Sequence, residues 1–527
     1  MIYHCEDHTC NYWDEGEKLP ERCPQCGRKL LRANEADMTG DDWTALGNTL
    51  WDAEASDKKR MVDCFRKAAY LGSAWGVCNL GICMEQGNGV EADPVQAFWL
   101  YQQAVEMGSL NAVCCLGVCY EYGIGTAPDA KQAAELYCKA AEYGSPRGQM
   151  LLARAFHDGI GVEADAAEAV HWVRAAAYQR YGEGMYWLGV CYEYGDGVEQ
   201  NWEHAVHWFR EAAESGVSAA MTDLGYCYEK GCGVEQSWEQ AFSWYRRGAE
   251  CGNPVSMSNL GLCYKRGYGV EQNWQEAVKW YEQGAQCGNL QSMNNLAYCY
   301  ERGEGVKQNM TEAIRWYTAA AEGGNADAMH DLGWLYDHGE GVEQDMKKAI
   351  CWYERAAEQN HPAAMNSLGE CYAMGRGVPR DLETAMEWYR RAAELGEAMA
   401  DYNMGWHLEQ AGKLSEAYAH YRKAADGNDD SAWWALGRFY ENGVVVAQDG
   451  KEARRCYETG EKLGSVKCKM RLARCKLLGI GGRRAKKAGL DLCRQALELA
   501  KESSEKEDYG YEAEMNLLRR TIAENES

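Results

Sequence analysis

A leucine-glycine dipeptide, or a close variant of it, recurs every 36 residues along most of this chain. This period constrains the fold more than any other feature. Leu46 stands 34 residues before the regular series, Leu436 follows the series at 32 residues, and Leu472 follows at a further 36. The series itself comprises Leu80, Leu116, Leu152, Leu188, Leu224, Leu260, Leu296, Leu332, Leu368 and Met404. A fixed period of this length predicts a solenoid, in which each repeat is one supersecondary unit stacked on the next.

Each repeat is expected to contain two helices. In the repeat around Leu224, the first helix is predicted over 218–230, with Leu224, Gly225 and Tyr228 on one face. Gly231 ends it, because glycine tolerates the left-handed conformation at a helix C-terminus. After a Gly-x-Gly-Val-Glu-Gln loop, a second helix is predicted over 238–251. Its buried side consists of Ala241, Trp244, Tyr245, Gly248 and Ala249.

The pattern A-x-x-x-L-G-x-x-Y-x-x-G-x-G-V, followed by A-x-x-W-Y-x-x-A-A-x-x-G, resembles the Sel1-like repeat, a relative of the tetratricopeptide repeat. The resemblance covers residues 37–476 in about thirteen repeats. The repeat at Met404 lacks the Gly-Val loop and is similar to a tetratricopeptide unit instead. The resemblance implies an all-α, right-handed superhelix that holds protein or peptide partners on its concave face, and it implies no catalytic residues.

The cysteines of the repeats are expected to be small buried residues. Cys83, Cys119, Cys191, Cys227, Cys263, Cys299 and Cys371 share one position of the first helix. Equivalent positions in neighbouring repeats are about 8–10 Å apart, which is too far for a disulfide.

The chain opens without the cationic and apolar segments of a secretory signal, and no apolar run reaches the length of a membrane span. These observations favour a cytoplasmic protein.

Two positions of the first helix, those of Tyr226 and Glu229, are predicted to line a partner-binding groove. The first position is aromatic in later repeats, and aromatic side chains are favoured at binding hot spots. The second position is mainly acidic, which suits a partner with basic flanks. The alternative is that the aromatic position only packs between neighbouring first helices. The candidate residues are Tyr226, Tyr298, Trp334, Trp406, Glu193, Glu229, Glu301 and Asp337.

A separate segment, residues 1–36, carries four cysteines in a C-x4-C-x12-C-x2-C pattern. Cys5, Cys10, Cys23 and Cys26 are predicted to hold one structural zinc ion, since four thiolates are a common tetrahedral zinc set. The segment resembles a zinc ribbon. A four-ligand site leaves no open coordination position, so the expected role is to cap the first repeat or to dock a protein.

The charge distribution bears on two alternative functions, a protein-binding scaffold and a nucleic-acid adaptor. The net charge of −25 disfavours nucleic-acid binding by the chain as a whole. Residues 451–500, however, hold 14 Lys and Arg against 5 Asp and Glu, and this basic segment could complement the acidic repeats or contact an anion. Residues 477–527 are predicted to be capping helices. The main expectation is a noncatalytic scaffold, and the alternative is an adaptor that reaches nucleic acid through the ribbon and the basic end.

Overall fold

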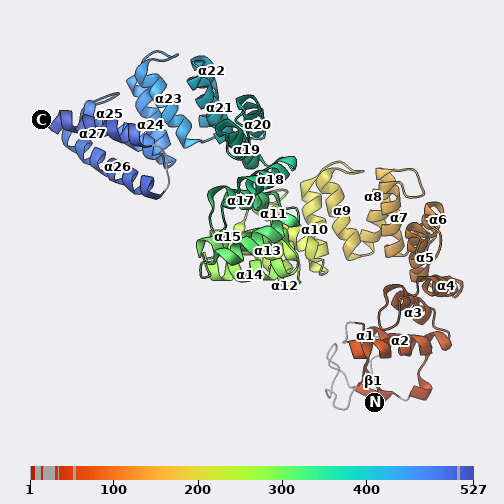
Figure 1. Cartoon of the computed structure of the whole chain (residues 1–527). Coiled ribbons are helices and arrows are strands. Elements are labelled where there is room, and N and C mark those ends of the chain that lie inside the picture. The colour runs from red at the N-terminus through yellow and green to blue at the C-terminus, as the bar shows by residue number, and fades with distance from the viewer. Residues whose placement is uncertain are drawn as a thin grey trace. The chain divides into compact units, whose positions relative to one another are not determined.

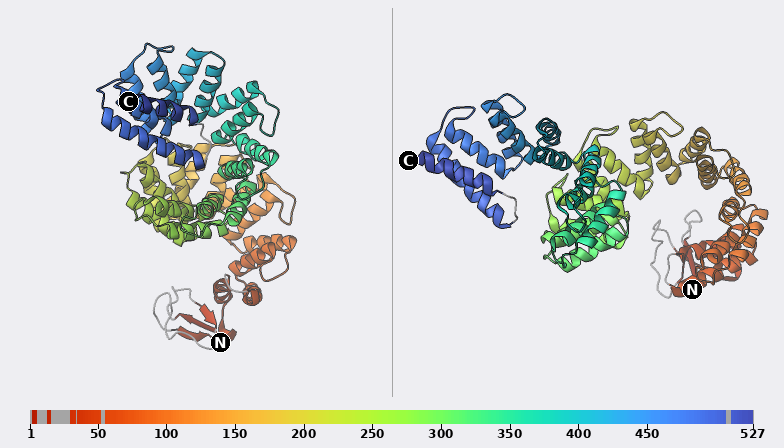
Figure 2. Two further views of the ribbon diagram at one scale, coloured as in Figure 1. Left: turned by 60° about the vertical axis from the view of Figure 1, so that its left-hand side comes forward. Right: turned by 45° about the horizontal axis from the view of Figure 1, so that its top comes forward.

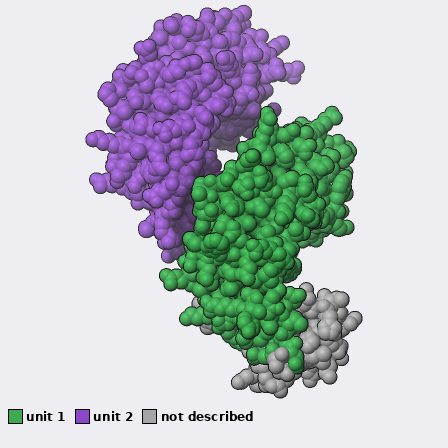
Figure 3. Space-filling view, turned by 90° about the vertical axis from the view of Figure 1, so that its right-hand side faces the viewer, with its two compact units in different colours: residues 1–273 green, residues 274–527 purple. Residues whose placement is uncertain are grey.

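The computed structural model describes residues 2–5, 13–15, 30–33, 35–51, 55–506 and 511–526, with the main chain alone described before residue 35. Most of these residues are helical (Figure 1). Their contacts divide the chain into two compact units, residues 1–273 and residues 274–527 (Figure 3).

Unit 1 opens with a small antiparallel sheet (Figure 2). Strand β1 (Ile2–Cys5) lies between β2 (Trp13–Glu15) and β3 (Leu30–Ala33), with Ile2 opposite both Glu15 and Ala33. A short 3-10 helix, η1 (Glu35–Asp37), leads into the first α-helix. Of the four predicted zinc ligands, only the main chain of Cys5 is placed, at the end of β1. Cys10, Cys23 and Cys26 lie outside the described residues.

The α-helices of unit 1 are α1 (Gly40–Thr49), α2 (Ala55–Tyr70), α3 (Ala74–Gln86), α4 (Pro94–Glu106), α5 (Leu110–Tyr122), α6 (Ala130–Glu142), α7 (Pro146–Asp158), α8 (Ala166–Tyr178), α9 (Gly182–Tyr194), α10 (Trp202–Glu214), α11 (Ser218–Lys230), α12 (Trp238–Glu250) and α13 (Pro254–Arg266). Those of unit 2 are α14 (Trp274–Gln286), α15 (Leu290–Arg302), α16 (Met310–Glu322), α17 (Ala326–His338), α18 (Met346–Glu358), α19 (Pro362–Met374), α20 (Leu382–Glu394), α21 (Ala398–Gln410), α22 (Leu414–Asp426), α23 (Asp430–Asn442), α24 (Gly450–Lys462), α25 (Val466–Leu478), α26 (Lys486–Lys506) and α27 (Glu512–Glu526).

Within each unit the helices pack mainly against their neighbours in sequence, which confirms the predicted all-helical solenoid. The odd-numbered helices up to α25 are the first helices of the repeats, and the even-numbered helices are the second helices. Some first helices also touch the first helix of the next repeat, as α5 touches α7. The apolar core therefore runs from repeat to repeat, and each repeat depends on its neighbours for burial.

The repeat around Leu224 agrees closely with its predicted bounds. Helix α11 covers Ser218–Lys230 as expected, and Gly231 ends it in the left-handed conformation with φ 74°. Helix α12 covers Trp238–Glu250, and all five residues predicted for its buried side are buried. The cysteine prediction is also confirmed, because six of the seven cysteines in the shared position are buried and Cys191 is half-buried.

The glycine of the leucine-glycine dipeptide makes room for a tyrosine of the second helix. A Cβ atom on Gly225 would lie 2.6 Å from Cε1 of Tyr245, well inside van der Waals contact. The same close approach joins Gly81 to Tyr101, Gly117 to Tyr137, Gly369 to Tyr389, Gly405 to Tyr421 and Gly437 to Tyr457. The leucine-glycine dipeptide, the most regular feature of the sequence, thus marks the place where the two helices of a repeat pack closely.

The loop between the two helices joins each repeat to the one before it. Gly233, with φ 68°, lies against the first turn of α10 in the preceding repeat, and a Cβ there would be 2.8 Å from the backbone nitrogen of Glu203. Three residues later, Gln236 donates its side-chain amide to the carbonyl of Glu229 at 2.8 Å. This bond satisfies a free carbonyl at the end of α11. Gln200, Gln272, Gln308, Gln344 and Gln448 make the equivalent bond in their own repeats.

Helices α26 and α27 close the carboxyl-terminal end over α25. They fall within residues 477–527, which were predicted to be capping helices. Arg471 of α25 links α27 to α23, because it contacts Glu514 of α27 at 2.6 Å and Glu441 of α23 at 3.3 Å. All three side chains are largely buried.

Candidate protein-binding face

One face of each first helix remains exposed between its packed neighbours. In α11 the side chains of Ala220, Met221, Leu224 and Cys227 are buried, whereas Tyr226 and Lys230 are exposed and Asp223 is half-buried. We call the positions equivalent to Ala219, Asp223, Tyr226 and Lys230 in every repeat the A face. Their spacing of four, three and four residues follows a single side of an α-helix.

The four aromatic candidates all lie on the A face, but they are not equally accessible. Tyr226 is 43% exposed and Trp406 is 39% exposed. Tyr298 and Trp334 are half-buried, and Trp334 packs against the core of unit 2 while its ring stacks on His338 at 4.2 Å. An incoming side chain therefore has freer access to Tyr226 and Trp406 than to the other two.

The acidic candidates have a structural task that the sequence reasoning missed. The hydroxyl of Tyr245 in α12 donates to the carboxylate of Glu229 in α11 at 2.9 Å. The same tyrosine-to-acid bond occurs at Tyr101–Glu85, Tyr137–Glu121, Tyr317–Glu301, Tyr353–Asp337, Tyr421–Glu409 and Tyr457–Glu441. The available signal was a recurring separation of 16 residues between an acid and a tyrosine, which falls to 12 in the shortened repeat of Tyr421.

This bond satisfies a hydroxyl that would otherwise be buried without an acceptor. Burial, and then the charge of Glu229, raise the pKa of Tyr245, so its hydroxyl stays protonated and donates. A hydrogen bond to a charged acceptor contributes about 1.5–3 kcal/mol. Asp337 is the extreme case, because it is only 3% exposed and also contacts Arg376 at 2.8 Å. The acids that make this bond thus have a structural role within the chain.

Arginine at the Tyr226 position neutralises the same carboxylates in three repeats. Arg154 reaches Glu121 of the preceding repeat at 2.5 Å, and Arg438 reaches Glu409 at 2.6 Å. Arg474 pairs with Glu441 in the same way. An arginine at this position therefore neutralises the acid of the preceding repeat within the chain.

The sequence model of the Sel1 repeat matches this chain over most of its length. The matched segments are 76–109, 112–145, 146–181, 182–217, 218–253, 254–289, 290–325, 326–361, 362–397, 398–429 and 432–465. The chain belongs to the Sel1 repeat family. The Sel1 repeat fold is that of a protein-interaction scaffold of the tetratricopeptide-like superfamily.

Two solved structures of Sel1 repeat proteins are similar to this chain. The first is c5321, a protective antigen of uropathogenic Escherichia coli strains. It is 30% identical with a TM-score of 0.58, and the match covers 81% of this chain and 94% of c5321. The second is a Sel1 repeat protein of Oxalobacter formigenes, which is 31% identical with a TM-score of 0.43 over 46% of this chain and 96% of the other. No curated protein matches this chain.

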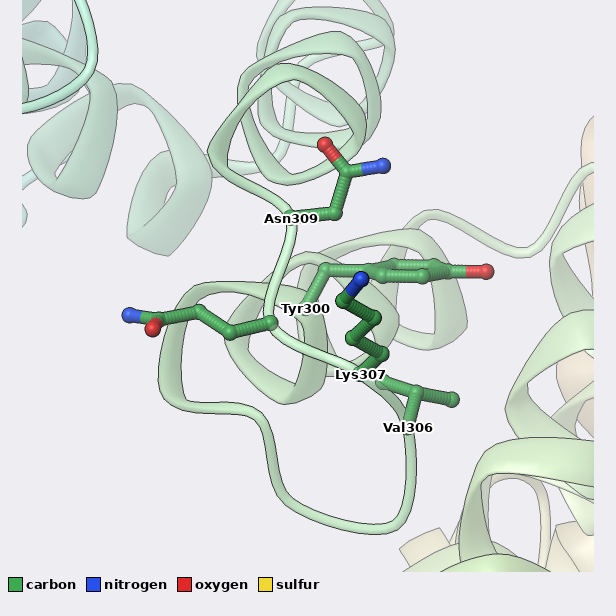
Figure 4. Close-up of a pocket in the computed structure, with 5 residues that line it drawn as sticks. Tyr300, Val306, Lys307 and Asn309 are labelled. Atoms are coloured by element: carbon green, nitrogen blue, oxygen red, sulfur yellow. The ribbon is translucent and has the colours of Figure 1, made fainter.

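An open hollow lies over the loop between α15 and α16, lined by Tyr300, Val306, Lys307, Gln308 and Asn309 (Figure 4). Its polar side chains already serve the fold. Asn309 caps α16 by accepting from Glu312, and Gln308 donates to the carbonyl of Glu301. Across the described part of the chain, no three metal-ligating side chains lie together and no helix is long and apolar enough to cross a membrane.

The basic carboxyl-terminal segment is largely engaged within the chain. Besides the pairs of Arg471 and Arg474, Arg454 contacts Glu458 at 2.9 Å and Arg484 donates to Asn525 at 2.5 Å. Arg483, Lys486 and Lys487 are exposed. These internal contacts favour the view that the basic segment complements the acidic repeats.

Proposed function

We propose that this chain is a noncatalytic cytoplasmic scaffold that binds a protein or peptide partner along the A face, with Tyr226 and Trp406 among its contacts. The observation that carries the proposal is the accessibility of aromatic side chains on this face, where Trp187 is 49% exposed and Tyr194 is 73% exposed. Exposed tyrosine and tryptophan supply large, rigid contact areas to a partner. The Sel1 repeat fold supports the same conclusion.

Site-specific photo-crosslinking tests this proposal. A photoreactive phenylalanine analogue replaces Tyr226 or Trp406 in the full chain, and the purified protein is irradiated in nuclease-treated lysate of its native host. The matched control carries the analogue at Tyr143, which is 68% exposed at the end of α6 and lies off the A face. We expect one discrete protein adduct from the A-face positions and none from Tyr143. Adducts from Tyr143 alone, or adducts that form only when the nuclease treatment is left out, would contradict the proposal.

We also propose that Cys5, Cys10, Cys23 and Cys26 hold one structural zinc ion. Four thiolates fit tetrahedral zinc, and a segment this short needs a metal or a comparable link to fold by itself. Protein purified without chelator is expected to contain one zinc per chain, measured by atomic emission. The Cys23→Ser/Cys26→Ser variant should lose it, whereas Cys251→Ser, at an exposed cysteine of the repeats, should retain it. Substoichiometric zinc in the unaltered chain would rule the proposal out.

A further inference from the structure

The tyrosine-to-acid bond of most other repeats is absent at Glu193 of α9. The residue 16 positions later, where other repeats carry tyrosine, is Phe209, whose ring has no hydroxyl to donate. The position at which Arg154, Arg438 and Arg474 neutralise the preceding acid is Tyr226 in the next repeat. Glu193 therefore lacks the tyrosine hydroxyl that most of its equivalents receive and the arginine that three of them receive.

A second carboxylate adds to this charge. Asp223 of α11 occupies the position from which Arg471 reaches Glu441 of the preceding repeat at 3.3 Å, so it faces Glu193 across the same step. None of the ion pairs between described residues includes Glu193 or Asp223. Burial raises the pKa of both carboxyls, and the charge of Asp223 raises the pKa of Glu193 further. The site is thus short of positive charge.

Exposed aromatic rings flank the two acids, because Tyr194 directly follows Glu193 in α9 and Tyr226 lies one turn after Asp223 in α11. Trp187, one turn before Cys191 in α9, is also exposed and packs edge-on to Tyr186 at 5.5 Å. Lys230 holds its ammonium 5.8 Å from the centre of the Tyr226 ring, but it forms an ion pair with Glu229 at 2.7 Å. His157 is held between Asp158 and Asp196. The charge beside Glu193 and Asp223 therefore remains negative.

We propose that Glu193 and Asp223, with the rings of Tyr194, Tyr226 and Trp187, bind an arginine side chain of the partner. This inference rests on the proposed function and names the chemistry of one contact. A guanidinium is planar, donates to carboxylates from two sides and stacks on aromatic faces, whereas a lysine ammonium is a more strongly hydrated point charge. Charge complementarity thus selects a partner segment that presents arginine.

Binding of capped, fluorescein-labelled hexaarginine and hexalysine, measured by anisotropy at fixed ionic strength, tests this site. The full chain is expected to prefer hexaarginine, and Glu193→Gln/Asp223→Asn should weaken hexaarginine binding at least ~tenfold. Glu199→Gln/Glu235→Gln removes the same charge from two exposed loop residues and should change the affinity less than about twofold. Equal losses in the two double variants, or equal affinity for both peptides, would overturn the arginine assignment.

Thermal unfolding shows whether the binding variant remains folded. Carboxyls whose folded pKa is raised lose stability as the pH rises through that pKa, so their neutral amides should unfold at a higher temperature than the original at pH 7. A lower unfolding temperature would contradict the described charge environment. The Tyr226 crosslinks separate the two proposals, because adducts that persist unchanged in the double variant would exclude arginine recognition while leaving the scaffold function intact.

Discussion

Replacing Gly233 by alanine is expected to destabilise the chain by about 3 kcal/mol, through a left-handed backbone that alanine disfavours and a methyl group placed against the main chain of α10. The clash falls on the joint between two repeats. We therefore expect hydrogen exchange to accelerate first in α10, α11 and α12. Denaturant unfolding monitored by circular dichroism, combined with exchange mass spectrometry, measures both effects.

The matched control is Gly252→Ala in the same repeat. Gly252 has φ 84°, but a Cβ there would meet nothing within 4 Å. Only the backbone cost of about 1 kcal/mol is expected, with no local increase in exchange around α10. If the two substitutions were equally costly, the loop would not form the joint described for it.

Replacing Arg471 by methionine is expected to cost about 3–5 kcal/mol, because it leaves the buried carboxylate of Glu514 without its cation. Glu441 keeps Arg474, so the damage should centre on α27. Protease cleavage of α27, followed by mass spectrometry, and the unfolding midpoint of unit 2 report the loss.

An exposed arginine provides the comparison for this prediction. Arg494 of α26 lies 3.6 Å from Asp491, and both side chains are more than half exposed. Arg494→Met is expected to change stability by less than about 0.5 kcal/mol, as for other solvated pairs. A stabilised Arg471→Met variant would mean that apolar packing outweighs the ion pair at this junction.

The two-helix repeat could be predicted because the local helix signals and the 36-residue period indicate the same two helices. The leucine-glycine step and the small residues around Tyr245 define both helices to within one residue at their ends. Such consistency between local propensity and packing is what makes solenoid sequences readable.

The A face was predicted less completely, because the exposure of its residues depends on how two helices cross. Thr222, one turn before Tyr226 in α11, is buried and bonds to Ser256 of the next repeat at 2.6 Å. Glu229 was placed on the correct helix, yet its bond to Tyr245 requires knowing which way that hydroxyl points. Trp334 and Trp406 share a sequence position but differ in exposure, since their neighbours differ. Spacing assigns a residue to a face, and its surroundings decide whether a partner can reach it.

The inter-repeat loop has a consequence for how such a protein changes in evolution. Gly233 packs against the preceding repeat and Gln236 bonds within its own repeat. Every 36-residue block therefore carries both the loop that meets the block before it and the helix that meets the loop of the block after it. A gene duplication or deletion in frame with this block alters copy number without creating a mismatched surface. The length of the array can therefore drift while single substitutions, such as the tyrosine at 226 or the phenylalanine at 209, give individual copies their own chemistry.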